Sequence, residues 1–371
     1  MREESSKRGK RIRLFGNIAK SGVRTVAIEC PRKVPWLHES NQPNRYSTRP
    51  LVVIRRRARF RGVTTGSRIE HCPSEHLTSN IHMNNSKTNT TTYKYATVRG
   101  RKIFYREAGN KNAPTIVLLH GFPSSSHMFR DLIPKLSDRL HVIAPDYIGF
   151  GYSDAPNTKE FEYTFDNLAE HVEEFLFSVL GLKKFSIYVQ DYGAPVGYRI
   201  ASKHQDAVDG IVVQNGNAYA EGINEAFDPM KPFWADRNAK TEKPVRSLLT
   251  KKTTVFQYTH GVKEPQRISP DAYTFDQFLL DRTGNDAVQL DLLYNYQSNV
   301  ALYDGWHEYF RAKQPRMLIV WGTNDPFFTV EGAKAYQRDI PHAELHLIDT
   351  GHFALEDSSE FIAERIREFL G

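Results

Sequence analysis

Residues 185–193 read Phe-Ser-Ile-Tyr-Val-Gln-Asp-Tyr-Gly, and a helical pattern follows from about Ala194 to His204. Residues 185–189 predict a short strand, so the chain passes from strand to helix through a tight turn. Gly193 allows that turn, and Gly197 lets the helix pack close to the strand. A strand, turn and helix of this kind present the middle residue, Asp191, at the apex. Functional groups of open parallel sheets lie at the carboxyl ends of the strands, which makes this carboxylate a candidate for chemistry.

The type of residue at the apex selects the reaction. A carboxylate that attacks an ester carbonyl would form a reactive anhydride, whereas one that attacks a saturated carbon forms a stable ester and expels a leaving group. Asp191 is therefore suited to alkyl halides or epoxides. The N-terminus of the following helix also favours the ionised form of this side chain. The alternative interpretation is an aspartate that caps a helix in an ordinary turn.

Around this turn, strand-like and helix-like segments alternate along the chain. The helical pattern 164–180 places its apolar residues on one face and stops at Gly181, and an amphipathic helix closes the chain near residue 370. Alternation of this kind predicts an α/β fold, with a mainly parallel sheet covered by helices on both faces. The predicted strands are 93–99, 102–107, 116–119, 140–144, 185–189, 210–214, 317–321 and 344–348.

One interval interrupts the alternation. Residues 215 to about 305 have few strand signals and many aromatic residues, and the interval is too long to be a loop in a compact domain. We interpret it as an inserted, mostly helical cap. The predicted domains are a core made of residues 93–215 and 306–371, and a cap made of residues 216–305.

The composition is typical of a globular protein, because 40% of the 371 residues are hydrophobic and 25% are charged. No apolar run approaches the roughly 18 residues of a membrane helix, so we expect no membrane span. The net charge of +7 comes from the front of the chain, since residues 1–95 hold 20 Lys+Arg and 6 Asp+Glu. We interpret residues 1–92 as a basic, disordered extension. The arginine run 55–61 leaves nuclear localisation or nucleic-acid binding open, and an organellar transit peptide is another alternative.

Two further residues stand just after predicted strands. Asp325 follows the strand 317–321, and His352 follows the last strand, 344–348. The carboxylate of Asp325 can accept the ring N–H of His352, fix its tautomer and stabilise its cation. The backbone N–H groups of Phe122 and Tyr192 are candidates for an oxyanion hole. Taken singly, Asp325 could form an Asx turn before proline, and His352 could be a surface histidine. The positions of Asp191, Asp325 and His352 after three different predicted strands together favour a catalytic site.

Cofactor motifs are missing from the sequence. No GxGxxG or Walker A loop opens a helix after a strand, so nucleotide binding is not supported. The two cysteines, Cys30 and Cys72, cannot form a four-cysteine zinc site or a disulfide scaffold. His342 and His346 are four residues apart, but His346 lies in a predicted strand, which disfavours a zinc pair. We expect neither a metal nor a cofactor.

With these segments in place, residues 93–371 resemble the α/β-hydrolase superfamily, in its haloalkane dehalogenase and epoxide hydrolase branches. The order nucleophile, acid, histidine along the chain is that of the superfamily. The segments that carry the resemblance are His120–Pro123, Pro145–Ser153, Val189–Gly193, Trp321–Pro326 and Gly351–Glu356.

Different motifs of the chain resemble different branches of the superfamily, and these branches act on different leaving groups. Val189-Gln190-Asp191 is similar to haloalkane dehalogenases, but Tyr192 stands where that family has a halide-binding Trp, and Phe122 stands where it has Asn or Glu. His-Gly-Phe-Pro at 120–123 is more similar to epoxide hydrolases, which use two cap tyrosines to protonate the opening oxygen. The candidates for substrate binding are Trp234, Tyr294 and Tyr296 in the cap and Trp306 just after it, and packing is the alternative role for such aromatics.

We therefore expect a cofactor-independent hydrolase that forms an alkyl ester on Asp191 and cleaves a carbon–halogen bond. The alternative is an epoxide hydrolase, and the non-enzymatic alternative is a catalytically silent ligand receptor on the same fold. The expected partners are a small apolar organic substrate and water, with no nucleic acid on the core and no membrane. The expected compartment is the cytoplasm, with organellar or nuclear targeting left open by the front segment. The sequence predicts no oligomeric state.

Overall fold

A computed structural model describes residues 90–371 of the chain. The predictions for the basic front segment, including the arginine run 55–61, lie outside the described residues apart from its last three positions. Within the described part, no helix is long and apolar enough to cross a membrane.

An eight-stranded sheet forms the centre of the described part, in the order β1-β2-β4-β3-β5-β6-β7-β8. The first two strands pair as an antiparallel hairpin, β2 pairs antiparallel with β4, and all later pairs are parallel. The predicted α/β class and its strands are thus confirmed, and their bounds shift by one or two residues. The strands are β1 (Thr92–Val98), β2 (Arg101–Ala108), β3 (Thr115–Leu119), β4 (His141–Pro145), β5 (Phe185–Gln190), β6 (Val208–Gln214), β7 (Arg316–Gly322) and β8 (Glu344–Ile348).

Alternate residues of each central strand enter different apolar cores, because side chains in a strand point to opposite faces. Val117 and Leu119 of β3 pack with α2 (Phe165–Glu174), α3 (Gly193–Lys203), α10 (Tyr303–Lys313) and α11 (Val330–Asp339). Ile116 and Leu118 of the same strand belong to the core that includes α1 (Ile133–Leu136) and α12 (Leu355–Leu370). The sheet is therefore covered on both faces, as its nearly continuous apolar strands require.

The helix predicted over 164–180 is present with one irregularity. Thr164 caps α2 by accepting a hydrogen bond from the Asn167 N–H, and the regular helix ends at Glu174. Residues 175–179 then continue as a π-helical turn. The chain leaves this turn through Gly181, whose φ of +67° is the left-handed conformation that glycine adopts without a steric penalty.

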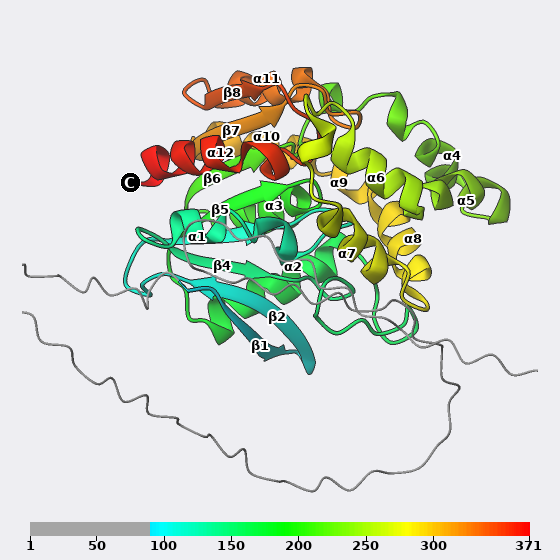
Figure 1. Cartoon of the computed structure of the whole chain (residues 1–371), viewed down its shortest axis with the longest axis horizontal. Helices are drawn as coiled ribbons and strands as arrows, with labels where there is room; N and C mark the ends of the chain where they lie inside the picture. Colours follow the sequence, from blue (N-terminus) through cyan, green and yellow to red (C-terminus); the bar gives the residue numbers. More distant parts are fainter. Residues whose placement is uncertain (1–89) are drawn as a thin grey trace, which may run out of the picture. The chain divides into compact units, whose positions relative to one another are not determined.

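The chain between β6 and β7 forms helices and contributes no strand to the sheet. Figure 1 shows α4 to α8 grouped together at one side of the sheet. The proposed core–cap boundary at residues 305/306 falls inside the first turn of α10, which packs with the core helix α3 through Phe310 and Tyr198. The remaining helices of this interval are α4 (Met230–Ala235), α5 (Ala239–Val245), α6 (Lys251–Thr259), α7 (Pro270–Leu280), α8 (Asn285–Asn295) and α9 (Gln297–Val300).

Gly193, at the start of α3, is held against the backbone of β3. A Cβ atom at this position would lie 2.1 Å from the carbonyl oxygen of Leu119. We expect Gly193→Ala to force the helix away from the sheet and to cost about 1–3 kcal/mol of unfolding free energy. The melting temperature should then fall by several degrees, at roughly 2–4 °C per kcal/mol.

Gly305→Ala is the matched control for this substitution. Gly305 lies inside α10, and apart from its chain neighbours and the nearby backbone of its own helix no atom of the described residues lies within 4 Å of the Cβ position. Alanine is the better helix former by roughly 0.5–1 kcal/mol, so this variant should melt at or slightly above the wild-type temperature. Equal melting of Gly193→Ala and the wild type would contradict the close approach of α3 to β3.

Candidate active site

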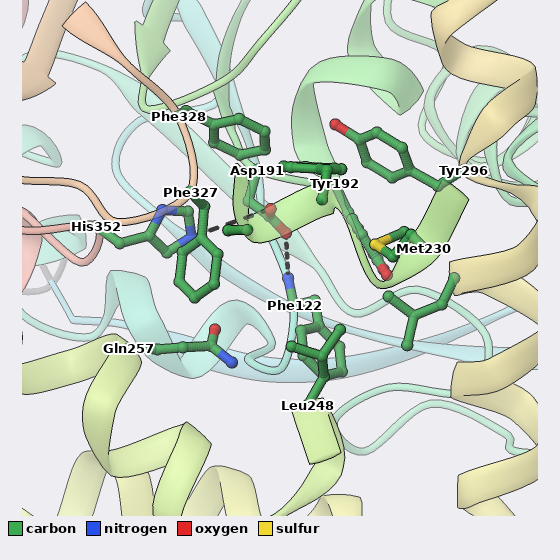
Figure 2. Close-up of a pocket in the computed structure, with 13 residues that line it drawn as sticks. Phe122, Asp191, Tyr192, Met230, Leu248, Gln257, Tyr296, Phe327, Phe328 and His352 are labelled. Carbon is green, nitrogen blue, oxygen red and sulfur yellow. Dashed lines mark hydrogen bonds and ion pairs between the residues drawn. The ribbon is translucent and has the colours of Figure 1, made fainter. Parts of the chain in front are cut away.

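Asp191 occupies the turn between β5 and α3 in a strained backbone conformation. Its φ is +49°, a left-handed value that non-glycine residues seldom adopt. The turn is closed by a hydrogen bond from the Ala194 N–H to the Asp191 carbonyl at 3.0 Å, and the Asp191 N–H donates to the Asn215 carbonyl at 3.2 Å. These contacts hold the carboxylate at the wall of a pocket, as Figure 2 shows, with 12% of its side chain exposed. Strain of this kind is commonly found at functional sites.

One carboxylate oxygen of Asp191 is bound by the backbone. The Phe122 N–H donates to Asp191 Oδ1 at 2.7 Å, and the backbone N–H of Tyr192 also acts to lower the pKa of this carboxyl group. The two backbone groups that the sequence suggested for an oxyanion hole thus lie at one carboxylate. Gly121 makes this approach possible, because a Cβ atom there would lie only 2.7 Å from Oδ1.

His352 lies between two carboxylates. Its Nδ1 is 2.8 Å from Asp325 Oδ2, and its Nε2 is 4.0 Å from Asp191 Oδ2. The side chains of His352 and Asp325 are 2% and 0% exposed, so both groups are shielded from water. The structure therefore brings together the three residues that the sequence placed at the ends of different strands.

Asn215, just after β6, is a site residue that the sequence analysis did not single out. Its Nδ2 donates to Asp325 Oδ2 at 2.8 Å, and its Oδ1 accepts from the Gly322 N–H at 2.9 Å. Asp325 Oδ1 accepts from the Phe327 N–H at 2.8 Å. The bonds to Asn215 and Phe327 fix the orientation of the Asp325 carboxylate, and the bond from Gly322 fixes Asn215. The available signal was a polar residue at the carboxyl end of the strand next to β5.

Burial and charge act in opposite directions on the two groups that face each other. Burial raises the pKa of Asp191 above its usual value, while the charge of His352 and the N–H groups of Phe122 and Tyr192 oppose the rise. Burial lowers the pKa of His352, but the charge of Asp325, its hydrogen bond and the charge of Asp191 outweigh burial and raise that pKa overall. The arrangement therefore stabilises the imidazolium form while Asp191 is ionised.

The pocket in front of Asp191 is small and mostly apolar. Its volume is about 50 Å³, which is several times the roughly 10–15 Å³ that one water molecule needs. Two polar side chains from the interval between β6 and β7, Gln257 and Tyr296, enter it (Figure 2). The residues that line it are Phe122, Asp191, Tyr192, Ala226, Phe227, Met230, Leu248, Gln257, Leu293, Tyr296, Phe327, Phe328 and His352.

Gln257, on α6, was also missed by the sequence analysis. Gln257 is 3% exposed, and its side-chain amide makes no hydrogen bond to any other described residue. A buried amide without a protein partner is costly, so this group is available for a ligand or for water. An isolated glutamine in a helical segment gives no sequence signal that it faces a pocket.

Of the four cap aromatics proposed for substrate binding, only Tyr296 lines the pocket. The indole N–H of Trp234 donates to the Leu293 carbonyl at 2.8 Å and is already used. Tyr294 packs edge-on against Phe233, and Trp306 packs against Tyr198. Within residues 90–371, no tryptophan lines this pocket.

Comparisons with known proteins agree with this architecture. Residues 114–359 match the family model described as alpha/beta hydrolase fold. An uncharacterized hydrolase of Saccharomyces cerevisiae is 42% identical over 72% of this chain and 92% of its own length. A haloalkane dehalogenase of Mycobacterium marinum is 41% identical over 71% of this chain and 87% of its own.

A solved epoxide hydrolase structure, that of CorEH, matches with a TM-score of 0.60 at 20% identity and covers 76% of this chain and 98% of its own. At that identity the likeness concerns the fold alone. The resemblance predicted from the segments around Asp191, Asp325 and His352 is confirmed by the family match and by the two relatives. The chain is therefore a hydrolase that belongs to the α/β hydrolase fold family, in the branch that includes haloalkane dehalogenases.

Proposed function

We propose that the chain hydrolyses a small organic substrate through an alkyl ester on Asp191. The observation that carries this proposal is the position of one carboxylate between two partners. Its Oδ1 accepts the Phe122 N–H at 2.7 Å, while its Oδ2 lies 4.0 Å from His352 Nε2. Oδ2 is then the oxygen that attacks a saturated carbon, and the bond from that carbon to the leaving group breaks.

Water completes the reaction in a second step. His352 Nε2 takes a proton from a water molecule whose oxygen attacks Cγ of the Asp191 ester. Negative charge then develops on Oδ1, to which the Phe122 N–H already donates, and the Tyr192 N–H lies close enough to stabilise the same group. Collapse breaks the bond between Cγ and Oδ2, and the proton passes from His352 to Oδ2, which leaves with the alkyl group as an alcohol. The water oxygen remains in the regenerated Asp191 carboxylate.

The charge on Asp191 links the two steps. While Asp191 is ionised it helps to raise the pKa of His352, together with Asp325. Ester formation removes that charge, so the pKa of His352 falls when a base is needed. The cationic ring thus supports an ionised nucleophile first, and the neutral ring accepts a proton afterwards.

A halide is the leaving group that the relatives favour, since the Mycobacterium marinum protein is a haloalkane dehalogenase. Among the pocket-lining residues between β6 and β7, Gln257 and Tyr296 have the side-chain donors that a halide would use, namely amide N–H groups and a hydroxyl. The small, apolar lining favours a short haloalkane over a polar or bulky substrate.

Epoxide opening is the second candidate, and Tyr296 is the observation that favours it. Burial and the neighbouring Tyr303 and Asp191 raise the pKa of Tyr296 well above its usual value, so its hydroxyl keeps a proton. An opening epoxide oxygen is basic enough to take that proton, whereas a halide needs only a hydrogen bond. No indole N–H of residues 90–371 faces the pocket to replace this donor.

The first test of the mechanism is His352→Gln, incubated with short bromoalkanes and epoxides. Without a base, hydrolysis stops after the first step, and mass spectrometry should find one substrate-derived adduct on Asp191. Bromide and diol release, scored separately for the wild type, identify the leaving group. Exposed His342→Gln is the matched control and should turn over like the wild type.

An adduct on another residue would overturn the proposal for Asp191. Turnover by Asp191→Asn would do the same. If all compounds raise the melting temperature of the wild type and none is converted, the protein is a ligand receptor and not an enzyme for these substrates.

Tyr296→Phe separates the two leaving groups. Loss of a proton donor should reduce kcat/KM for an epoxide by about 100-fold, whereas loss of one neutral hydrogen bond should reduce it for a bromoalkane by about 10-fold or less. Tyr294→Phe, two residues away and outside the pocket lining, is the matched control. Equal losses for both substrate classes would exclude a proton-donating role for Tyr296.

The pH dependence follows from the raised pKa of His352. In the substrate-free protein, we expect the ring to titrate above 6.5, because Asp325 and Asp191 favour its charged form. Asp325→Asn removes the strongest stabilising charge, so the midpoint should move to lower pH. Imidazole NMR signals measure both midpoints, and a midpoint that does not change in Asp325→Asn would contradict the assignment.

A further inference from the structure

Gln190, the last residue of β5, contacts the base nitrogen of the proposed reaction and has no role in it so far. Its residue is 0% exposed, and its Nε2 is 3.0 Å from His352 Nε2. Its Oε1 is buried and has no hydrogen-bond partner among the described residues. Both ends of this amide therefore lie in the site, and only one of them is used.

The observed contact fits one protonation state of His352. Nδ1 shares a hydrogen with Asp325 Oδ2 at 2.8 Å, so the neutral ring carries its lone pair on Nε2. Gln190 Nε2–H donates to that lone pair. If His352 Nε2 also carried a proton, two donors would face each other at 3.0 Å, which is repulsive.

The same contact blocks the proposed base. A lone pair that already accepts the Gln190 N–H is not free to accept a proton from water. A half-turn of the amide removes this block and places Oε1 at His352 Nε2, where it can accept from the imidazolium that forms. The end of the amide that points away from His352 has space because residue 121 is a glycine. A Cβ atom there would lie only 2.3 Å from Gln190 Oε1.

We propose that Gln190 is a positioning residue whose amide turns as His352 gains or loses its proton. With its N–H toward His352 Nε2 it holds the neutral ring and covers the lone pair. With its oxygen toward that nitrogen it holds the cationic ring before ester formation and during hydrolysis. This inference rests on the proposed two-step function, because only that cycle requires both states of His352.

Two kinds of side chain surround the His352 ring besides Gln190. The charged groups that face the ring are Asp325, after β7, and Asp191, after β5, and neither contacts Nε2 within hydrogen-bond distance. The apolar side chains that pack against the ring are Phe327, Phe328 and Phe353, and they can neither donate a hydrogen bond to it nor accept one from it. Among residues 90–371, Gln190 is therefore the side chain that lies within hydrogen-bond distance of His352 Nε2.

The test combines a spectroscopic measurement with one variant, both on the full chain. In wild-type protein, the side-chain NH₂ signals of Gln190 should shift with pH at the midpoint of the His352 ring signals. Gln214, its partner in the register of β5 and β6, is the internal control. Its Nε2 donates to the His352 carbonyl at 2.8 Å and its Oε1 accepts from Tyr188, so its signals should not follow that titration.

Gln190→Met keeps a similar volume and removes both functions of the amide. We expect decay of the Asp191 ester to slow by about 10- to 100-fold, a larger loss than that of the first burst of leaving group, because only the second step requires the ring to gain a proton. Ester decay at the wild-type rate in Gln190→Met would overturn the role of Gln190 and leave the mechanism intact. Gln190 NH₂ signals that do not shift at the His352 midpoint in the wild type would do the same. Absence of any adduct in His352→Gln would instead reject the mechanism itself. If Gln190→Met does not fold, the wild-type NMR titration decides alone.

Discussion

The site depends on a backbone constraint at one turn. Asp191 adopts a φ of +49° between β5 and α3, and Gly193 and Gly121 let three chain segments approach this point closely. This approach brings the Phe122 N–H within 2.7 Å of the carboxylate. Any larger side chain at either glycine would separate the backbone donors from the oxygen that they bind. The packing of β3, β5 and α3 is therefore also the basis of the proposed electrostatic stabilisation.

Burial gives the charges of the site their influence on one another. Asp325 and His352 are almost fully shielded, so a change of one charge affects the other more than it would in water. In the proposed cycle, conversion of Asp191 to an ester changes that charge balance and converts His352 from a cation into a base. Gln190 would follow the same change through its amide. One covalent step thus sets the protonation state required for the next.

In the proposed reaction, the leaving group would be selected in a different part of the molecule. The segment between β6 and β7 supplies Gln257, from α6, and Tyr296, from the turn between α8 and α9, to the pocket. The sheet and the loops after its strands supply the carboxylates and the histidine. The same core chemistry is compatible with a halide or with an epoxide oxygen. Under the proposed function, their discrimination rests on whether Gln257 and Tyr296 only donate hydrogen bonds or Tyr296 also donates a proton.

Sequence alone predicted the sheet, its covering helices and the three residues Asp191, Asp325 and His352. It did so because each feature depends on local patterns, namely short apolar runs and the residue that follows each strand. Tertiary structure decided which of the cap aromatics reaches the pocket, and it brought Asn215, Gln190 and Gln257 to the site. These contacts join residues up to 162 positions apart, as for Gln190 and His352. They depend on how helices and strands pack in space, which no local pattern records.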